Sequence, residues 1–341
     1  MGSLKARDRG GPVMLWLGLA LAIAAAVSFA LGRYPISPRE LGGILLSKVL
    51  PIEPFWPARM ETVLFNIRLP RVLLACMVGC CLSAAGAAYQ GIFQNPMASP
   101  DILGAAAGAA FGAALAILLG AGSRAITLCA FALSLGSVGL VWMVGGRARG
   151  RGVLGLILSG IMVGSLFQAG TSFIKLAADP HGQLPAITYW LMGSLSGARL
   201  RDAGFAAIPM ALGLAPMLVL RWRLTLLTLG DDEARAMGVN VGAVRLVYVL
   251  CATLVTAASV SVSGIIGWVG LVIPHLSRRL AGDHYRHLLP VSMLFGALFL
   301  LVVDTAARSL LTTEIPLGIL TAFIGAPFFL YLILRREGEG P

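Results

Sequence analysis

The stretch VMLWLGLALAIAAAVSFAL at residues 13–31 decides the class of protein to which this chain belongs. Its 19 residues include no charged side chain. At about 1.5 Å per residue, a helix of this length crosses the hydrocarbon layer of a bilayer, which is roughly 30 Å thick. The stretch is longer than the apolar core of a secretory signal, which has about 7–15 residues. We therefore interpret it as a membrane-spanning helix that the mature protein retains.

Nine further apolar stretches follow the first. Apolar residues make up 58% of the 341-residue chain and charged residues only 12%, about half the charge of a soluble domain. We predict an all-α polytopic membrane protein of about ten helices. It forms one transmembrane domain over residues 1–341, with a helical bundle at 13–335 between tails at 1–12 and 336–341. The later stretches cover residues 69–91, 101–120, 125–145, 153–177, 203–220, 243–262, 265–277, 288–306 and 315–334.

The net charge of +11 reflects membrane topology. The cations lie in short breaks between apolar stretches, without the interleaved aromatic residues of a nucleic-acid site. They gather in alternate breaks, such as Arg147, Arg149 and Arg151, and again at Arg335 and Arg336. Cytoplasmic loops of membrane proteins carry such an excess. The pattern predicts that both termini are cytoplasmic and that the partner is the lipid bilayer, with no nucleic acid.

A weak internal similarity suggests an inverted repeat. Arg68-Leu69 opens the second apolar stretch and Arg245-Leu246 opens the seventh. Five helices separate the two starts, an odd number, so the two halves would have opposite orientations. Helices 2–5 would then correspond to helices 7–10, and transporters often place their path at such an interface.

Several function classes lack the residues that they need. The chain has no His-Glu-x-x-His and no Gly-x-Ser-x-Gly, and none of its three lysines follows a glycine, as a phosphate-binding loop requires. We therefore expect no enzyme activity and no cofactor on this chain. The five cysteines are interpreted as packing residues, without a metal site. An ion-coupled secondary transporter, the alternative from another class, needs a titratable relay at mid-bilayer, whereas the candidates here lie at helix ends.

Two polar clusters flank the apolar stretches. In QGIFQNPMASPD at residues 90–101, the prolines break the helix, and polar side chains satisfy the freed backbone, with Asp101 suited to start the next helix. A structural turn and a substrate contact both remain open for this segment. Farther along, Asp304 and Arg308 lie four residues apart, with Glu314 just beyond. They either pair with each other, which lowers the cost of burying Arg308, or present an arginine to an outside partner.

One cytoplasmic segment, residues 221–242, is strongly polar. Glycines bracket a short helical turn with three acids at its start, where they complement the helix dipole. We interpret it as the place where energy enters the protein, with a plain solvated loop as the alternative. Its candidate residues are Gly230, Asp231, Asp232, Glu233, Ala234, Arg235 and Gly238.

Together these segments resemble the FecCD family of ABC permeases, the type II importers of cobalamin, haem, ferric siderophores and molybdate. The resemblance runs from about residue 13 to 335. It rests on RLPR at 68–71, QNPMASPDILG at 94–104, GWVGLVIPH at 267–275, EIPLG at 314–318 and GAPFF at 325–329. Its motif residues, expected to be structural, are Asn95, Pro96, Pro100, Asp101, Gly104, Pro274, His275, Asp304, Glu314 and Pro316.

The resemblance implies a homodimer in the bacterial inner membrane, served by two cytoplasmic ATPase subunits that hold ATP and Mg²⁺. A soluble external binding protein would deliver the cargo, a metal chelate, with ferric siderophore or haem first and cobalamin or molybdate as alternatives. Arg68, Arg71 and Arg308 would dock glutamates of that protein. The segment around Glu233 and Gly238 would couple to the ATPases.

Other features bear on the conduit. Residues 184–197, with Tyr189 and Trp190, are expected to form a short external helix beside its mouth. Two departures from the family pattern stand out. Met97 replaces the usual leucine, a change that conserves volume. The stretch GRGVL at 150–154 lacks the hydroxyl residues of the cobalamin importer's inner gate, so gate residues are not assigned here.

Overall fold

The structure, a computed structural model, describes residues 10–32, 34–51, 53–147 and 152–337. Within these ranges the regular elements are all helices. The elements are α1 (Gly10–Ala30), α2 (Pro38–Leu46), α3 (Ala58–Thr62), the π-helix η1 (Val63–Arg68), α4 (Leu69–Ile92), the 3₁₀ helix η2 (Pro100–Leu103), α5 (Ala105–Leu118), α6 (Ser123–Arg147), α7 (Gly152–Ala177), α8 (Gln183–Leu191), α9 (Leu200–Val219), α10 (Arg221–Leu227), α11 (Asp231–Ala236), α12 (Val241–Ser263), α13 (Val269–Ala281), α14 (Tyr285–Ser309) and α15 (Leu317–Glu337).

Each of the ten predicted apolar stretches contains a helix, so the all-α polytopic prediction is confirmed. In the described ranges, seven helices are long and apolar enough to cross a membrane. The apolar parts of α5 and α15 are shorter, and α13 has 13 residues. Residues 1–9 of the predicted tail at 1–12, residues 338–341 of the predicted tail at 336–341, and Gly150 and Arg151 of the GRGVL stretch lie outside the described residues.

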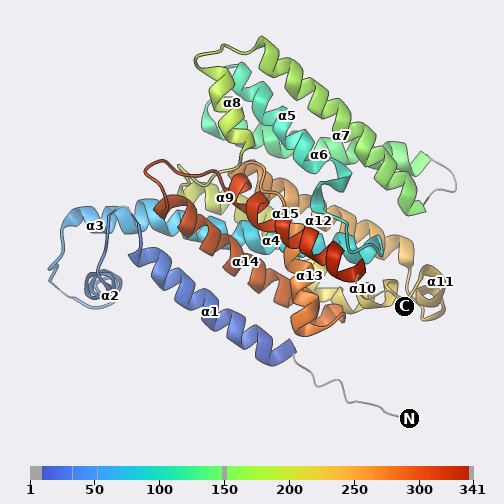
Figure 1. Ribbon diagram of the computed structural model, residues 1–341, viewed down its shortest axis with the longest axis horizontal. Helices are drawn as coiled ribbons and strands as arrows, with labels where there is room; N and C mark the ends of the chain where they lie inside the picture. The colour runs from blue at the N-terminus through green and yellow to red at the C-terminus, as the bar shows by residue number, and fades with distance from the viewer. Residues whose placement is uncertain (1–9, 33, 52, 148–151, 338–341) are drawn as a thin grey trace.

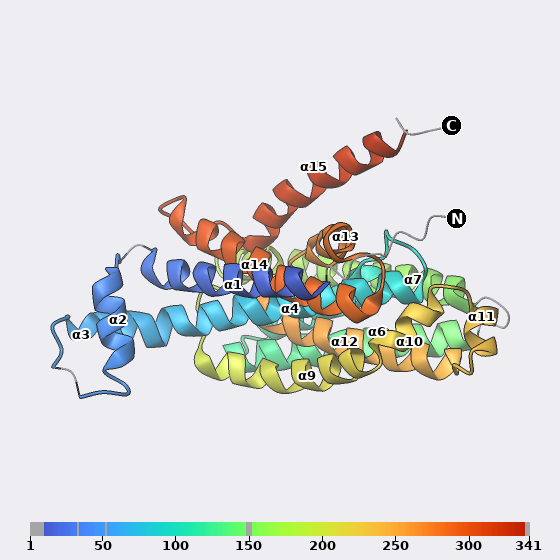
Figure 2. The same cartoon turned by 90° about the horizontal axis from the view of Figure 1, so that it is seen from below.

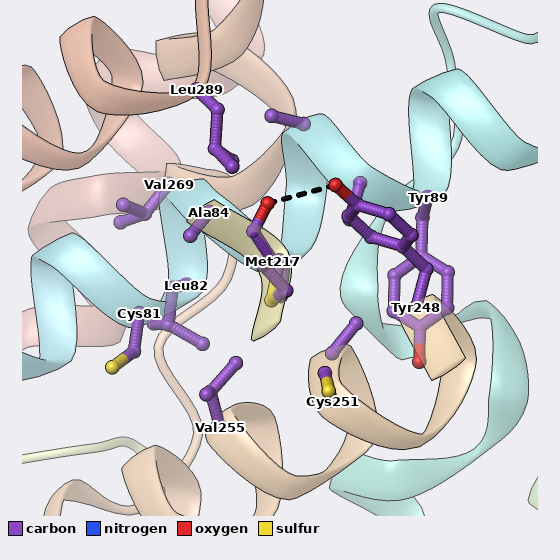
Figure 3. Close-up of a cluster of buried hydrophobic side chains, with 14 of the residues drawn as sticks. Cys81, Leu82, Ala84, Tyr89, Met217, Tyr248, Cys251, Val255, Val269 and Leu289 are labelled. Carbon is purple, nitrogen blue, oxygen red and sulfur yellow. Dashed lines mark hydrogen bonds between the residues drawn. The ribbon is translucent and has the colours of Figure 1, made fainter. Parts of the chain in front are cut away.

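Helices α4 and α12 form the centre of the bundle. In Figure 1, α5, α6 and α7 lie on one side of this pair, and α1, α13 and α14 lie on the other. Small side chains let these helices approach closely, because lipid tails provide no hydrophobic drive for helix association. Figure 3 shows the apolar core that results, in which the Tyr248 hydroxyl donates to the Met217 carbonyl at 2.8 Å. Cys81 and Cys251 lie within this core as free thiols.

The two ends of the bundle differ. α10 and α11 lie at one end, together with the first residue of α1 and the last residues of α15, whereas α2 and α3 lie at the other end (Figures 1 and 2). The two ends of the described chain therefore share the side that the sequence assigns to the cytoplasm. We call the α10–α11 end the inner end and the α2–α3 end the outer end.

The two central helices are followed by the same order of elements. After α4 the chain leaves helical geometry for residues 93–99 and then forms η2 and the short α5. After α12 it does so for residues 264–268 and then forms the short α13. This correspondence supports the inverted repeat, which stays a prediction.

The crossing of α4 with α13 depends on a glycine, and this gives a first prediction. A Cβ atom at Gly86 would overlap the carbonyl oxygen of Gly270. We expect Gly86→Ala to lower the free energy of unfolding in detergent by about 1–3 kcal/mol, because overpacking forces the two backbones apart. Gly139→Ala on α6 is the control, since nothing lies within 4 Å of its added methyl group. Equal stability of the two variants would contradict the close crossing.

Candidate functional site

A buried ion cluster joins α4 to α14 at the outer end. The Arg71 Nε donates to both carboxylate oxygens of Asp304, at 2.9 and 3.0 Å, and its Nη1 donates to Glu314 Oε1 at 2.8 Å. Asp304 has no solvent exposure and Arg71 is 7% exposed. A carboxylate with no access to water needs a charged partner of this kind. The predicted pairing of Asp304 with Arg308 is present, at 3.9 Å from the Arg308 Nε. The main partner of Asp304 is Arg71, which belongs to α4, a helix far away in the sequence but packed against α14.

The other two predicted docking arginines cap a helix. The last four carbonyl groups of a helix have no partner inside it. At the outer end of α1, Arg68 donates to the carbonyls of Phe29 and Ala30. Arg308 donates to those of Ser28 and Leu31. Cations at this position also complement the negative end of the helix dipole.

Arg68, Arg71 and Arg308 are therefore brought together at the outer end, as predicted, but their side chains face the protein. They are 4%, 7% and 8% exposed. Their contacts give all three arginines a structural role, which for Arg308 is the alternative stated above. A direct contact with glutamates of a binding protein stays a prediction.

The predicted coupling segment folds as a short protrusion at the inner end. Gly230 and Gly238 have φ angles of +129° and +79°, which glycine adopts without strain, and they bracket α11. Ala234 is fully buried, and its N–H donates to the Gly230 carbonyl at 3.0 Å. Asp232, Glu233 and Met237 are exposed on the opposite face. The segment thus has one face fixed to the bundle and another available to a partner.

Salt bridges hold this protrusion in place. Asp231 accepts from Arg245 at the start of α12 at 2.9 Å, and Arg235 donates to Asp232 at 2.7 Å. Among the predicted coupling residues, Asp231 and Arg235 therefore serve the local structure. Glu233 is exposed and makes no ion pair with any of the residues that the structure describes.

A polar cluster beneath the protrusion was missed by sequence reasoning. Arg278 of α13 donates to Gln90 of α4 and, at 3.0 Å, to the Tyr285 hydroxyl of α14. The Tyr285 N–H donates to Thr225 of α10 at 3.0 Å. These contacts connect the helices at the inner end to α10, which leads directly into α11. In the sequence each of these residues looks like an ordinary polar group at a helix end. The cluster becomes visible only when the structure brings these residues, which are far apart in the sequence, together.

The proline-containing break after α4 forms a turn, and a contact of this segment with substrate stays a prediction. The Asn95 side chain accepts from the Met97 N–H at 2.8 Å, and the chain turns through Pro96 before η2 begins at Pro100. Asp101 lies in the first turn of the next helix, η2, as predicted. Neither η2 nor α5 has a side-chain capping bond, and Gly104 in a left-handed conformation (φ +76°) precedes α5. Asp101 is exposed beside α7.

A hollow surface lies along α7 and α15. Two adjoining cavities of about 690 and 660 Å³ share Leu191 and Ile265 as lining residues. The first follows α7 and includes Asp101, and the second is apolar and includes Trp268 and Phe323. Figure 2 shows α15 projecting away from the bundle, so this face is open in the single chain.

The residues predicted at the mouth occupy the other side of α8. Tyr189 and Trp190 line a third cavity of about 530 Å³, with Ser194, Ser196 and Asp202. α8 ends at Leu191, earlier than the expected residue 197, because the chain leaves the helix at Gly193 with φ +72°. Leu191 and Met192 are the residues that reach the α7–α15 hollow.

The remaining motif residues lie in α13 and just before α15, and Trp268 of the same motif lines the hollow. Trp268 has a φ of +70°, a conformation that costs a bulky residue about 1–3 kcal/mol and orients its ring toward Phe329 of α15, with the ring centroids 6.5 Å apart. Pro274 lies within α13, where the His275 ring faces that of Phe328. Pro316 precedes α15, whose first N–H donates to the Gly193 carbonyl at 2.8 Å.

Comparisons with known proteins cover nearly the whole chain. The model of the FecCD transport family matches residues 20–335. The molybdate import system permease protein MolB of Haemophilus influenzae is 40% identical, over 96% of this chain and 97% of its own. The hemin transport system permease protein HmuU of Yersinia pestis is 40% identical, over 96% and 98%. A solved structure described as an inward-facing conformation of a putative metal-chelate type ABC transporter has a TM-score of 0.85 at 39% identity, over 95% and 99% of the two chains.

Proposed function

The chain belongs to the FecCD transport family, and from this premise we propose that two copies form the conduit of one importer, driven by two separate ATPase subunits. The chain itself is a multi-pass permease subunit of an ABC importer of the bacterial inner membrane. The ATPases would hold ATP and Mg²⁺ and would bind the exposed face of α11. An external binding protein would deliver the cargo at the outer end.

The hollow between α7 and α15 is the observation that carries this proposal. Its apolar part includes Phe323, which is 74% exposed, while α15 stands off the bundle (Figure 2). A second copy facing this surface would enclose a path between two hollows. Lipid alone would leave the polar part of the hollow in hydrocarbon, which is unfavourable.

The cargo is proposed to be a metal chelate, with ferric siderophore or haem first. The hollow of about 690 Å³ in one copy is wide enough for a bulky ligand. Cobalamin and molybdate are the alternatives within the family.

The outer surface is proposed as the docking face for the binding protein. Arg68 and Arg308 hold the end of α1 there, and Arg71 holds α14 against α4. Their contribution to docking would be to keep this surface in shape, with direct ion pairs to the binding protein as the further possibility that the family resemblance implies.

Uptake into vesicles tests the proposed function. The chain is reconstituted with its partner ATPases and binding protein, and uptake of ferric citrate, haemin, molybdate and cyanocobalamin is measured with ATP inside. We expect uptake of at least one probe, and its loss when the ATPase is inactivated. Uptake that persists with an inactive ATPase and a proton gradient would support an ion-coupled transporter and contradict the proposal.

Glu233 offers a more specific prediction. It is exposed on α11, so its removal leaves the packing of Ala234 unchanged. We expect Glu233→Ala to lower the amount of cargo imported per ATP severalfold, because the contact that transmits the ATPase motion is weakened. Asp283→Ala, which changes another exposed inner-end acid that forms only a 3.7 Å pair with Arg278, is the control. A wild-type ratio in Glu233→Ala would count against a coupling role.

A further inference from the structure

Helix α7 exposes two faces with different chemistry. One face is apolar and includes Met162, Leu166, Phe173 and Leu176, each at least 69% exposed. The other carries Ser165, Gln168, Ser172 and Lys175, at the three- and four-residue spacing that places side chains on one side of a helix. We call these four residues the polar face of α7.

The polar face borders the hollow, next to Ile161 and Thr171 of the same helix. All four of its residues line the cavity of about 690 Å³, with Asp101 on the same cavity wall, whereas the four apolar residues are absent from that lining. Polar and ionisable side chains at membrane depth face protein or a water-filled cavity because lipid contact is costly. The apolar face therefore suits lipid, and the polar face suits water and solute.

The polar groups differ in whether the protein already satisfies them. The Ser165 hydroxyl donates to the Ile161 carbonyl at 2.8 Å, and that of Ser172 donates to the Gln168 carbonyl at 3.0 Å. Within the described residues, the Gln168 amide and the Lys175 ammonium have no hydrogen bond or ion pair. These two groups are therefore available to a solute in the hollow.

The charges are ordered along the path. Lys175 lies in the last turn of α7, toward the outer end. Ser165 lies ten residues, or about 15 Å, closer to the inner end. Asp101 lies near that level, because its segment packs against α7 at Gly160, where an added Cβ would contact Ile102 and Leu103. A cargo entering from outside meets the ammonium group first and the carboxylate later. A cation in the last turn also complements the helix dipole wherever it points, but here it points into the hollow.

We propose that the polar face of α7 is a low-affinity subsite for anionic oxygen groups of the cargo, such as carboxylates or an oxyanion. Lys175 attracts the anion at the outer part of the hollow, and Gln168 donates its amide hydrogens farther in. Asp101 repels the anion at the inner part, so the cargo passes without tight binding, as conduction through a path requires. This inference rests on the proposed function, because it assumes that the hollow is the path.

Charge substitution at Lys175 tests the subsite. Initial uptake rates are measured with the reconstituted importer for ferric citrate, molybdate and uncharged cyanocobalamin, at low and high salt. We expect Lys175→Glu to lower the uptake rate of an anionic probe at least tenfold at subsaturating concentration, and Lys175→Gln to lower it severalfold. Lys175→Arg, which keeps the positive charge, should have the uptake rate of the wild type. Arg124→Glu is the matched control, since Arg124 is exposed at the same end, at the start of α6, but lines none of the three large cavities.

The outcomes separate this inference from the proposed function. If no probe shows ATP-dependent uptake by the wild type, the proposed function fails. If the wild type and Lys175→Glu carry anionic probes equally well, the subsite is contradicted while the proposed function stands. The same holds if the wild type carries only cyanocobalamin. A change in the mass of the detergent-solubilised complex in Lys175→Glu would instead assign Lys175 to contact between copies and overturn the inference.

Discussion

Replacing Asp304 with leucine is expected to destabilise the protein more than any other single change considered for this chain. The substitution leaves the Arg71 guanidinium, which is 7% exposed, with only the contact to Glu314. Removing one partner of a buried ion pair costs about 3–5 kcal/mol, because the remaining charge stays desolvated. We expect the free energy of unfolding in detergent to fall by this amount, measured by denaturant titration.

Two further variants define what the ion pair does. Arg71→Met combined with Asp304→Leu removes both charges together, and we expect it to be more stable than Asp304→Leu alone. Asp232→Ala, which breaks a pair whose acid is 93% exposed, should change stability by about 0–1 kcal/mol. An Asp304→Leu protein as stable as the wild type would show that Arg71 is hydrated in the membrane-embedded protein.

The largest effect on transport is expected from Ala234→Pro. The Ala234 N–H donates to the Gly230 carbonyl, and proline removes this donor and clashes with the preceding turn. Because α11 has only six residues, the loss unfolds most of its exposed face. We expect ATP-driven uptake to fall at least tenfold in vesicles.

The same experiment distinguishes uncoupling from unfolding. The stability of Ala234→Pro in detergent should stay close to that of the wild type, because α11 is a six-residue helix at the inner end that contacts α10 and α12 and none of the other long helices strongly. The control is Arg221→Ala at the start of α10, which changes the inner end without altering α11. Ala236→Pro is not suitable as a control because it lies in α11 itself. Wild-type uptake by Ala234→Pro would contradict a role of α11 in coupling.

The sequence predicts the part of the fold that depends on local composition. Apolar length identifies the spanning helices, and the glycines with their three acids identify α11, because both signals lie within one short stretch. The break after α4 is also predicted, since Pro96 and Pro100 lie close together and each disfavours a continuous helix. The position of Asp101 at the start of a helix is predicted, but its place in the cavity beside α7 is not, because a helix-start residue and an exposed cavity residue have the same local sequence pattern.

The sequence does not predict contacts between distant residues. Arg71 meets Asp304, and Arg278 meets Gln90, only after α4, α13 and α14 pack together. Tyr189 and Trp190 line a different cavity from the α7–α15 hollow, and this placement depends on how α8 packs against the bundle. The polar face of α7 could have been found from its three- and four-residue spacing, but its meaning depends on knowing which side of α7 borders the hollow.

The arginine contacts at the end of α1 have a consequence for biogenesis. A ribosome makes α1 first, but Arg68 follows about forty residues later and Arg308 emerges only when α14 is synthesised, near the end of translation. Until then, the terminal carbonyl groups of α1 rely on water at the membrane surface. The nascent first helix is therefore expected to sample several positions in the bilayer, and to lock beside α14 as one of the last steps of assembly.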